Sequence, residues 1–330
     1  MTDPIHSGPE TMMGAVANDI AGEAVERQEE AAAEASAVLD KPHSLGSDAW
    51  WQMRRRPMFW FSAGLIALFI LMAVWPSLFT NGDPRYCDLT QARHKPSWEH
   101  WFGTDIQGCD VYARTIHGAR SSILVGVFCT AGVTVIGSIV GLLAGYFGRW
   151  LDVVLSRVGE IFFAIPTLLG GIVILYSFPS RPGTPYAIVV GKVVIAITLL
   201  QWPTIARIMR ASVLQVMPHE YVTAARGLGA RPGRIIVSHI LPNAVAGVIA
   251  VATINLGVYI ALEATLSFLG IGLQPPAISW GIAISEASKM GFLTSAPHML
   301  LFPSLFLSLT VLAFIMLGEV VRDALDPRLR

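Results

Sequence analysis

Residues 121–147 read SSILVGVFCTAGVTVIGSIVGLLAGYF, a run of 27 residues without a charged side chain. An α-helix needs about 20 predominantly apolar residues to cross the hydrocarbon core of a bilayer. The composition of the whole chain agrees, because 53% of its residues are hydrophobic and 14% are charged, whereas soluble domains carry about 25% charged residues. We therefore expect an integral membrane protein.

Five further apolar runs have a similar length, and within their cores only Lys192 and Glu263 carry a charge. The first begins at Met58, too far along the chain for a signal peptide, so it is expected to be retained. We predict an all-α membrane protein with six transmembrane helices, although the ends of the fourth and fifth are open. The spans are placed at about 58–79, 121–147, 158–178, 186–210, 240–270 and 299–319.

The distribution of Lys and Arg predicts the orientation of these spans. With the N-terminus inside, the internal segments near the spans carry thirteen such residues and the external segments carry seven. Cytoplasmic loops are enriched in Lys and Arg, so both termini are expected in the cytoplasm. Residues 80–120 then form a periplasmic segment, and residues 211–241 form a cytoplasmic loop.

The N-terminal residues differ in composition from the rest. Residues 1–49 hold ten acidic and two basic residues and lack a broad apolar stripe. Such a segment cannot bury enough apolar surface to fold alone. We interpret it as a mobile acidic tail in the cytoplasm, with a regulatory docking role as the alternative, and assign residues 50–330 to the membrane domain.

The cytoplasmic loop contains MPHEYVTAARGLGARPGRII, residues 217–236. Glu220 suits the first turn of a helix, and Gly227 and Gly229 suit its end. Pro232 can open a second short helix that leads back to the membrane. The loop is thus predicted to form a helix–turn–helix. A short amphipathic helix of this kind fits a groove on a partner protein, and a helix resting on lipid is the alternative.

Within this loop, Thr223-Ala224-Ala225 is followed by three residues and then Gly229, with Leu-Pro further downstream. The pattern resembles the EAA loop of permease subunits of ATP-binding-cassette importers, with Thr in place of the first Glu, as in many peptide-type permeases. The resemblance implies a coupling helix that sits in a cleft of an ATPase subunit. The residues it would contribute are Glu220, Tyr221, Thr223, Ala224, Ala225, Arg226, Gly227, Leu228 and Gly229.

Three more motifs are similar to the dipeptide and oligopeptide permeases of the DppC/OppC type. They are FGTDIQGCDVYAR at 102–114 with GARSS at 118–122, EATLSFLGIGL at 263–273, and GEVVRDALDPR at 318–328. These motifs cover most of residues 50–330, but not the acidic tail. The resemblance implies the MetI-like permease fold of these importers.

The same resemblance implies a function and a set of partners. The chain would be half of the pathway through which an ATP-driven importer moves di- or oligopeptides across the bacterial cytoplasmic membrane. Its partners would be a second, DppB/OppB-type permease, two ATPase subunits or one fused ATPase, an external peptide-binding protein and the lipid bilayer. The exact cargo stays open.

No catalytic residue, bound metal, cofactor or nucleic acid is expected for this chain. The sequence contains no GxxxxGK[ST] phosphate loop, so ATP and Mg are expected on the partner ATPases. A secondary transporter or channel that works without an ATPase is the alternative function. It would need ionisable residues near the middle of the membrane.

Four residues stand out against the family pattern or against the membrane. Cys109 replaces an Arg that the family usually has, and Cys87 lies in the same external segment. Because the periplasm is oxidising, we hypothesise a Cys87–Cys109 disulfide, with two separate thiols as the alternative. Lys192 and Glu263 are structural or pathway candidates. For these two we favour a snorkelling lysine and a structural hydrogen bond to a neighbouring loop.

Glycine and proline residues predict how the spans pack and bend. Gly137, Gly141 and Gly145 are spaced by four residues and share one helix face. Small residues at such positions let two membrane helices approach closely. Pro166 and Pro203 can bend the spans that contain them.

Overall fold

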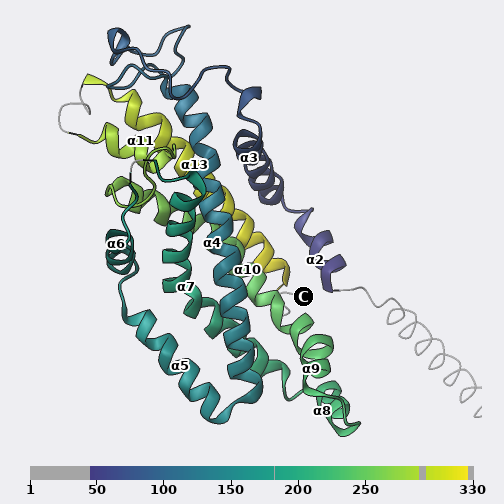
Figure 1. Ribbon diagram of the computed structural model, residues 1–330. Helices are drawn as coiled ribbons and strands as arrows, with labels where there is room; N and C mark the ends of the chain where they lie inside the picture. Colours follow the sequence, from purple (N-terminus) through teal and green to yellow (C-terminus); the bar gives the residue numbers. More distant parts are fainter. Residues whose placement is uncertain (1–44, 182, 290–294, 326–330) are drawn as a thin grey trace, which may run out of the picture. The chain divides into compact units, whose positions relative to one another are not determined.

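A computed structural model describes residues 45–181, 183–289 and 295–325 of the chain (Figure 1). Contacts group residues 1–48 and residues 49–330 into two separate units. The predicted acidic tail therefore lies almost entirely outside the described residues. Only its last five positions are described, within a helix that begins at Leu45 and runs on to Met53.

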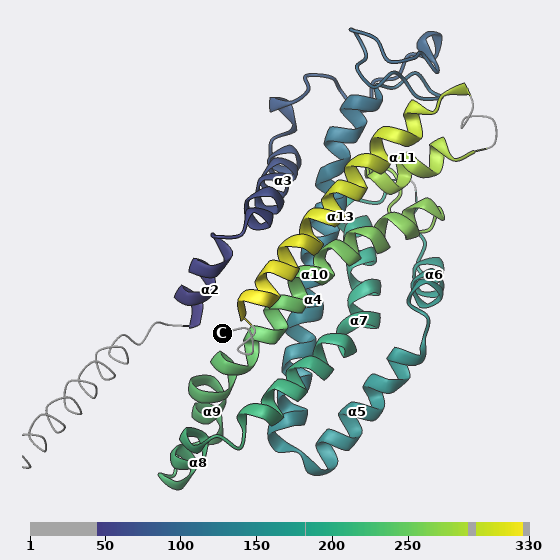
Figure 2. The same cartoon turned by 180° about the vertical axis from the view of Figure 1, so that it is seen from behind.

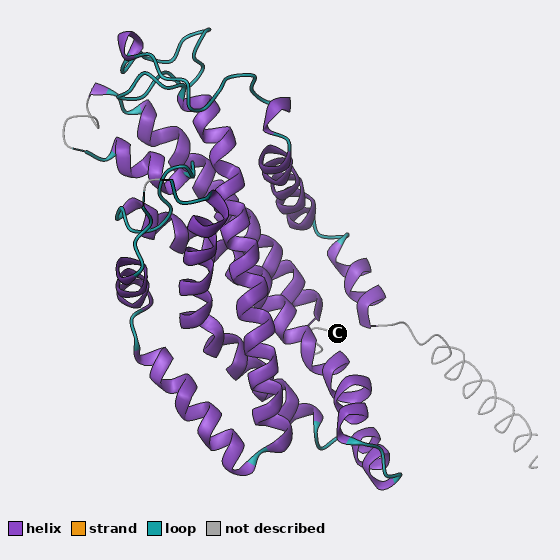
Figure 3. Ribbon diagram, viewed as in Figure 1, coloured by secondary structure: helices purple, strands orange, loops and turns teal. Residues whose placement is uncertain are grey.

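The described residues are helical and contain no β-strand, only two isolated bridges (Figure 3). This confirms the predicted all-α class. The helices are α2 (Leu45–Met53), α3 (Pro57–Val74), α4 (Val111–Phe147), α5 (Arg149–Ala164), α6 (Thr167–Ser177), α7 (Tyr186–Val216), α8 (Glu220–Gly227), α9 (Pro232–Ile235), α10 (Leu241–Phe268), α11 (Trp280–Ala287) and α13 (His298–Leu325). A π-helical turn, Ile236–Ile240, joins α9 to α10.

Five helical segments of the described chain are long and apolar enough to cross a membrane. They are α3, α4, α7, α13 and the continuous stretch Pro232–Phe268. The pair α5 and α6 passes the same test only together, and it is bent by 85°. The expected six spans are therefore reached only if this bent pair counts as one.

The predicted third span, 158–178, is corrected in shape. It is not one straight helix, because α5 ends at Ala164 and α6 begins at Thr167 at a sharp angle. Proline disfavours the helical conformation in the residue before it, and Ile165 is accordingly extended, with φ −79° and ψ 119°. The bend anticipated at Pro166 is confirmed.

Two helices extend beyond the predicted spans. The predicted periplasmic segment, 80–120, includes the first ten residues of α4, which begins at Val111 because the Asp110 carboxylate caps it. This carboxylate accepts hydrogen bonds from the amides of Tyr112 (2.7 Å) and Ala113 (3.2 Å). At the other side, α7 continues six residues beyond the predicted end at 210, to Val216.

Among the described helices, α4 and α7 make the most extensive contact, and glycine residues let their backbones approach. A Cβ atom added to Gly141 would lie 2.3 Å from the carbonyl oxygen of Ala206, and one added to Gly137 would lie 2.7 Å from that of Trp202. One added to Gly145 would lie 2.9 Å from a side-chain carbon of α7. The predicted close packing of this glycine face is confirmed.

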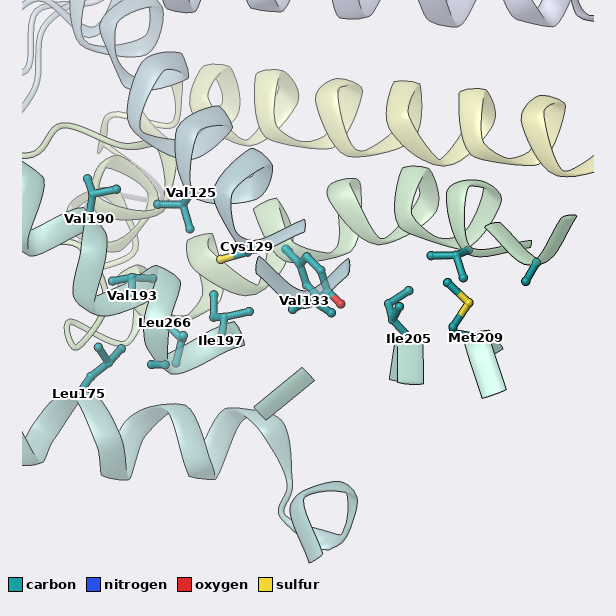
Figure 4. Close-up of a cluster of buried hydrophobic side chains, with 14 of the residues drawn as sticks. Val125, Cys129, Val133, Leu175, Val190, Val193, Ile197, Ile205, Met209 and Leu266 are labelled. Carbon is teal, nitrogen blue, oxygen red and sulfur yellow. The ribbon is translucent and has the colours of Figure 1, made fainter. Parts of the chain in front are cut away.

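Buried side chains extend this contact into a core. Val125, Cys129 and Val133 of α4 pack with Val193 and Ile197 of α7 (Figure 4), and the buried thiol of Cys129 serves there as a small apolar side chain. A second cluster joins α3, α4, α10, α11 and α13. In Figure 2, α10 and α13 run side by side.

We expect Gly141→Leu to destabilise the protein strongly, because the new side chain would meet the backbone of α7. Overpacking a core costs about 1–3 kcal/mol even where side chains can shift, and a backbone carbonyl at 2.3 Å cannot shift aside easily. Thermal unfolding in detergent should show a Tm lower by several degrees.

The matched control is Gly64→Leu in α3, because no atom lies within 4 Å of a Cβ built there. It should leave the Tm near that of the parent protein. Equal Tm values for the two variants would contradict close packing of α4 on α7.

Candidate functional site

The loop with the EAA-like pattern forms a helical hairpin at one end of the long helices, which we call the α8 hairpin (residues 217–240). It starts directly after α7, turns through α8 and α9, and returns to α10 through the π-helical turn (Figure 1). This is the predicted helix–turn–helix. Residues 75–110, which the sequence predicts to face the periplasm and which we call the external segment, lie at the opposite end of the same helices in both views.

Local sequence sets both ends of α8. His219 is extended, with φ −66° and ψ 146°, and its carbonyl oxygen accepts the first bonds of the helix from Val222 and Thr223. Glu220 lies in the first turn and Arg226 in the last, so both charges are placed favourably in the field of the helix dipole.

A Schellman motif ends α8. Gly229 has a φ of +77°, its amide donates to Arg226 (3.0 Å), and the amide of Ala230 donates to Ala225 (3.1 Å). A positive φ suits glycine because it has no Cβ atom. Gly229 is therefore the residue that turns the chain, whereas Gly227 is the last helical residue.

Buried side chains fix the base of the hairpin. Val222 is fully buried, and so are Ile235 of α9 and Ile240 of the π-helical turn; Val216 at the end of α7 joins the same core cluster. Sequence reasoning left Val222 out of the site. The sequence does carry a cue for the burial of Val222. It is the one β-branched aliphatic residue of α8, and it lies three residues before the half-buried Ala225, on the same side of the helix.

The predicted coupling residues lie together on the rest of α8. Leu228 is 89% exposed and Tyr221 is 40% exposed, although both are apolar or aromatic. Ala225 differs from both, because it packs partly against the core. The remaining predicted members are exposed, namely Glu220, Thr223, Ala224, Arg226, Gly227 and Gly229.

Lys192 and Glu263 are both engaged by protein groups. The Lys192 ammonium donates a hydrogen bond to the carbonyl oxygen of Pro179 (3.0 Å). Glu263 is fully buried, and its carboxylate accepts a hydrogen bond from Ser267 (2.7 Å), whose hydroxyl in turn accepts one from the amide of Leu273 (2.9 Å). The bonds of Ser267 hold the loop after α10 against that helix, whereas the second carboxylate oxygen of Glu263 is buried without a hydrogen-bond partner among the described residues.

Cys87 and Cys109 are joined in the external segment, with Sγ–Sγ 2.06 Å. The bond closes a loop that contains a short 3-10 turn at Leu89–Gln91. At the start of that turn, the Asp88 carboxylate accepts hydrogen bonds from the amide (2.9 Å) and the hydroxyl (2.7 Å) of Thr90. These bonds lower the pKa of Asp88, with the hydroxyl having the larger effect.

Arg114 fastens the external segment to the helices. Its guanidinium pairs with Asp105 in that segment and with Glu286 of α11, the latter at 2.9 Å. The Asp105 carboxylate also accepts the amides of Gln107 (2.8 Å) and Cys109 (2.9 Å). Burying the charges of Arg114 and Asp105 costs hydration free energy. Their ion pairs and the amide hydrogen bonds to Asp105 offset that cost. The external segment is thus a folded part of the membrane domain.

No group of three or more His, Cys, Asp or Glu residues in the described ranges is arranged to hold a metal ion.

Comparison with known proteins adds two family matches. Residues 137–330 match the family described as "Binding-protein-dependent transport system inner membrane component". Residues 44–96 match "N-terminal TM domain of oligopeptide transport permease C". Together the two matches include α3, most of the helical core and the α8 hairpin.

Curated relatives align over most of their length. The chain is 37% identical to the dipeptide transport system permease protein DppC of Alkalihalophilus pseudofirmus, over 86% of this chain and 90% of the relative. It is 36% identical to the oligopeptide transport system permease protein OppC of Bacillus subtilis, over 91% of this chain and 95% of the relative. It is 35% identical to the glutathione transport system permease protein GsiD of Pectobacterium atrosepticum, over 85% of this chain and 91% of the relative.

Among solved structures, the inward-facing MetNI methionine ABC transporter is similar in fold. The TM-score is 0.50 at 22% identity, covering 64% of this chain and 95% of that chain. The expected MetI-like permease fold is therefore confirmed. The orientation with both termini inside stays a prediction.

We expect mass spectrometry of non-reduced peptides to find Cys87 and Cys109 linked, because the structure joins them in a segment expected to face the oxidising periplasm. Cys129 is the internal control, since it is buried between helices. An alkylating reagent should modify only Cys129, and only after unfolding. Alkylation of Cys87 and Cys109 without a reductant would contradict the disulfide.

Proposed function

Because this chain belongs to the family of binding-protein-dependent transport system inner membrane components, we propose that it forms half of the translocation pathway of an ATP-driven peptide importer. It is a multi-pass membrane permease and a translocation subunit of an ABC importer. The second half of the pathway would be a homologous permease of the DppB/OppB type.

Peptide cargo is the specificity that the relatives favour. Their names refer to dipeptides, oligopeptides and glutathione, which is itself a short peptide. Identity of 35–37% extends along most of this chain. An external binding protein would deliver di- or oligopeptides to the permease pair in the bacterial cytoplasmic membrane.

The α8 hairpin is proposed to couple the permease to an ATPase subunit. The observation that carries this proposal is Leu228, which is 89% exposed at the tip of a hairpin whose base is buried. Contacts between proteins concentrate their energy in a few apolar or aromatic anchors ringed by polar groups. Leu228 and Tyr221 offer such anchors, and Glu220 and Arg226 flank them.

The attachment of the hairpin suits the transfer of a movement. The N-terminal end of the hairpin is continuous with α7. Its C-terminal end returns to α10 through Ile235 and Ile240, which are both buried. A displacement of α8 would therefore reach two long helices at once. Rigid-body movement of packed elements between two arrangements is a common form of conformational switch.

ATP hydrolysis would be carried out by the partner subunits. ATP and Mg would be bound and hydrolysed by two ATPase subunits or one fused ATPase, and this chain would serve as their non-catalytic permease. The alternative of a secondary transporter or channel would need ionisable groups ready to bind a coupling ion. Lys192 is less suited to that task, because its ammonium already donates to the carbonyl oxygen of Pro179, and one carboxylate oxygen of Glu263 is already bonded to Ser267.

The test of coupling is Leu228→Asp in the assembled importer. A buried, unpaired carboxylate at the centre of an interface opposes binding, and loss of an anchor costs about 2 kcal/mol or more. We expect peptide uptake to fall by more than about tenfold, while thermal stability stays unchanged because Leu228 touches little of its own chain.

The matched control is Trp150→Asp. Trp150 is also apolar and 72% exposed, and it lies in the first turn of α5, which begins at the same end of the long helices as the α8 hairpin (Figure 1). Uptake should be largely retained in this variant. Normal uptake by Leu228→Asp, or equal loss in both variants, would argue against a coupling role for α8.

A further inference from the structure

The halves of α4 and α7 that lie away from the α8 hairpin carry an apolar surface to which the proposed coupling role assigns no part. A cavity of about 640 Å³ runs between them, lined by Leu124, Phe128 and Val135 of α4 and by Val190 and Ile195 of α7, among other apolar residues. Phe128, Val135 and Ile195 are exposed although they are large and apolar. We call this cavity the α4–α7 groove.

The α4–α7 groove has a defined length. Along α4 it extends from Leu124 to Ile136, which is about 18 Å at 1.5 Å per residue. Half of the hydrocarbon core of a bilayer is about 15 Å thick. The groove closes below Ile136 because Gly137, Gly141 and Gly145 bring the backbones of the two helices into contact there. Its length therefore matches the thickness of one leaflet, and its closed end lies near the middle of the predicted span 121–147.

A second, polar cavity of about 350 Å³ opens directly above the groove. Tyr186 lines both cavities, and its hydroxyl is 3.1 Å from that of Ser121. Arg85 and Arg120 line the polar cavity together with His117. We call this cavity the basic head site.

The charges of the basic head site favour an anion. Arg120 is exposed, and within the described ranges no hydrogen bond or ion pair engages its guanidinium. Arg85 donates to the carbonyl oxygen of Pro276 (3.3 Å). Asp83 is the one carboxylate of the site, and its Oδ1 accepts the amide of Arg85 (2.9 Å). Two guanidinium groups against one carboxylate leave a net positive charge.

From these two adjoining cavities we infer a binding site for one anionic phospholipid, with its phosphate at Arg120 and one acyl chain in the α4–α7 groove. Basic pockets between membrane helices recognise anionic head groups, and guanidinium groups match phosphate oxygens in geometry. A helix of a partner subunit fits less well, because it would need an apolar groove through the full bilayer, about 30 Å long.

Native mass spectrometry of the purified importer, titrated with phosphatidylglycerol or phosphatidylcholine, tests the head site. Arg120→Gln should weaken phosphatidylglycerol binding by roughly tenfold, the scale of one charge-assisted hydrogen bond. Arg181→Gln is the matched control, because Arg181 is exposed in the connection between α6 and α7 and lines neither cavity. It should bind as the parent complex does.

Gly191→Leu tests the groove. Gly191 lines it, and no atom lies within 4 Å of a Cβ built there, so leucine should fill the groove without disturbing the fold. We expect loss of the bound phosphatidylglycerol, with Gly64→Leu retaining it. Each complex is first checked for an unchanged Tm.

Three outcomes would overturn the inference. They are phosphatidylcholine binding as tight as phosphatidylglycerol binding, unchanged phosphatidylglycerol binding in both Arg120→Gln and Gly191→Leu, and a map of the assembled importer with a partner helix in the groove.

Discussion

The fold depends on direct contact between the backbones of α4 and α7. In a bilayer the surrounding lipid is as apolar as leucine, so helices gain little from hiding side chains from it and associate through close packing. At Gly137, Gly141 and Gly145 no side chain separates the two helices, which brings many backbone atoms within van der Waals distance. The core of Val125, Cys129 and their neighbours, and the packing of α10 on both helices, are arranged around this contact.

The same contact links the proposed coupling hairpin to the rest of the membrane domain. α7 is 31 residues long, about 46 Å, and runs without a break into the residues before α8. Asp152 of α5 pairs with Arg210 near the lower end of α7 at 2.5 and 2.6 Å. A push on α8 would therefore reach α7, α4 and α5 through contacts that do not depend on flexible loops. Beyond these glycines, towards Leu124, the two helices stay packed through side chains, and the α4–α7 groove lies along this stretch.

The amino-acid sequence was the best guide to features that depend on the conformational preferences or polarity of neighbouring residues. Pro232, Gly229 and Glu220 mark the ends of short helices by their own conformational preferences, so the helix–turn–helix could be placed within a few residues. The glycine face of α4 was visible as a four-residue spacing. Apolar runs located the spans because the bilayer imposes both their length and their lack of charge.

Features that depend on distant partners were beyond the sequence. Pro166 indicated a bend, but not its angle of 85°. The early start of α4 is the exception, because its cue is the local cap at Asp110, which lies outside the apolar run that marked the span. The burial of Val222 depends on Ile235 and Ile240, and Lys192 finds the carbonyl oxygen of Pro179 across a turn.

The central claim is that the tip of the α8 hairpin touches an ATPase subunit, and photo-crosslinking in the assembled importer tests it most directly. A benzoylphenylalanine placed at position 228 should crosslink to an ATPase subunit, with a yield that changes when ATP is added. The same residue placed at position 150 should not. Crosslinks from position 228 to lipid alone, or to the ATPase from position 150 alone, would contradict the account.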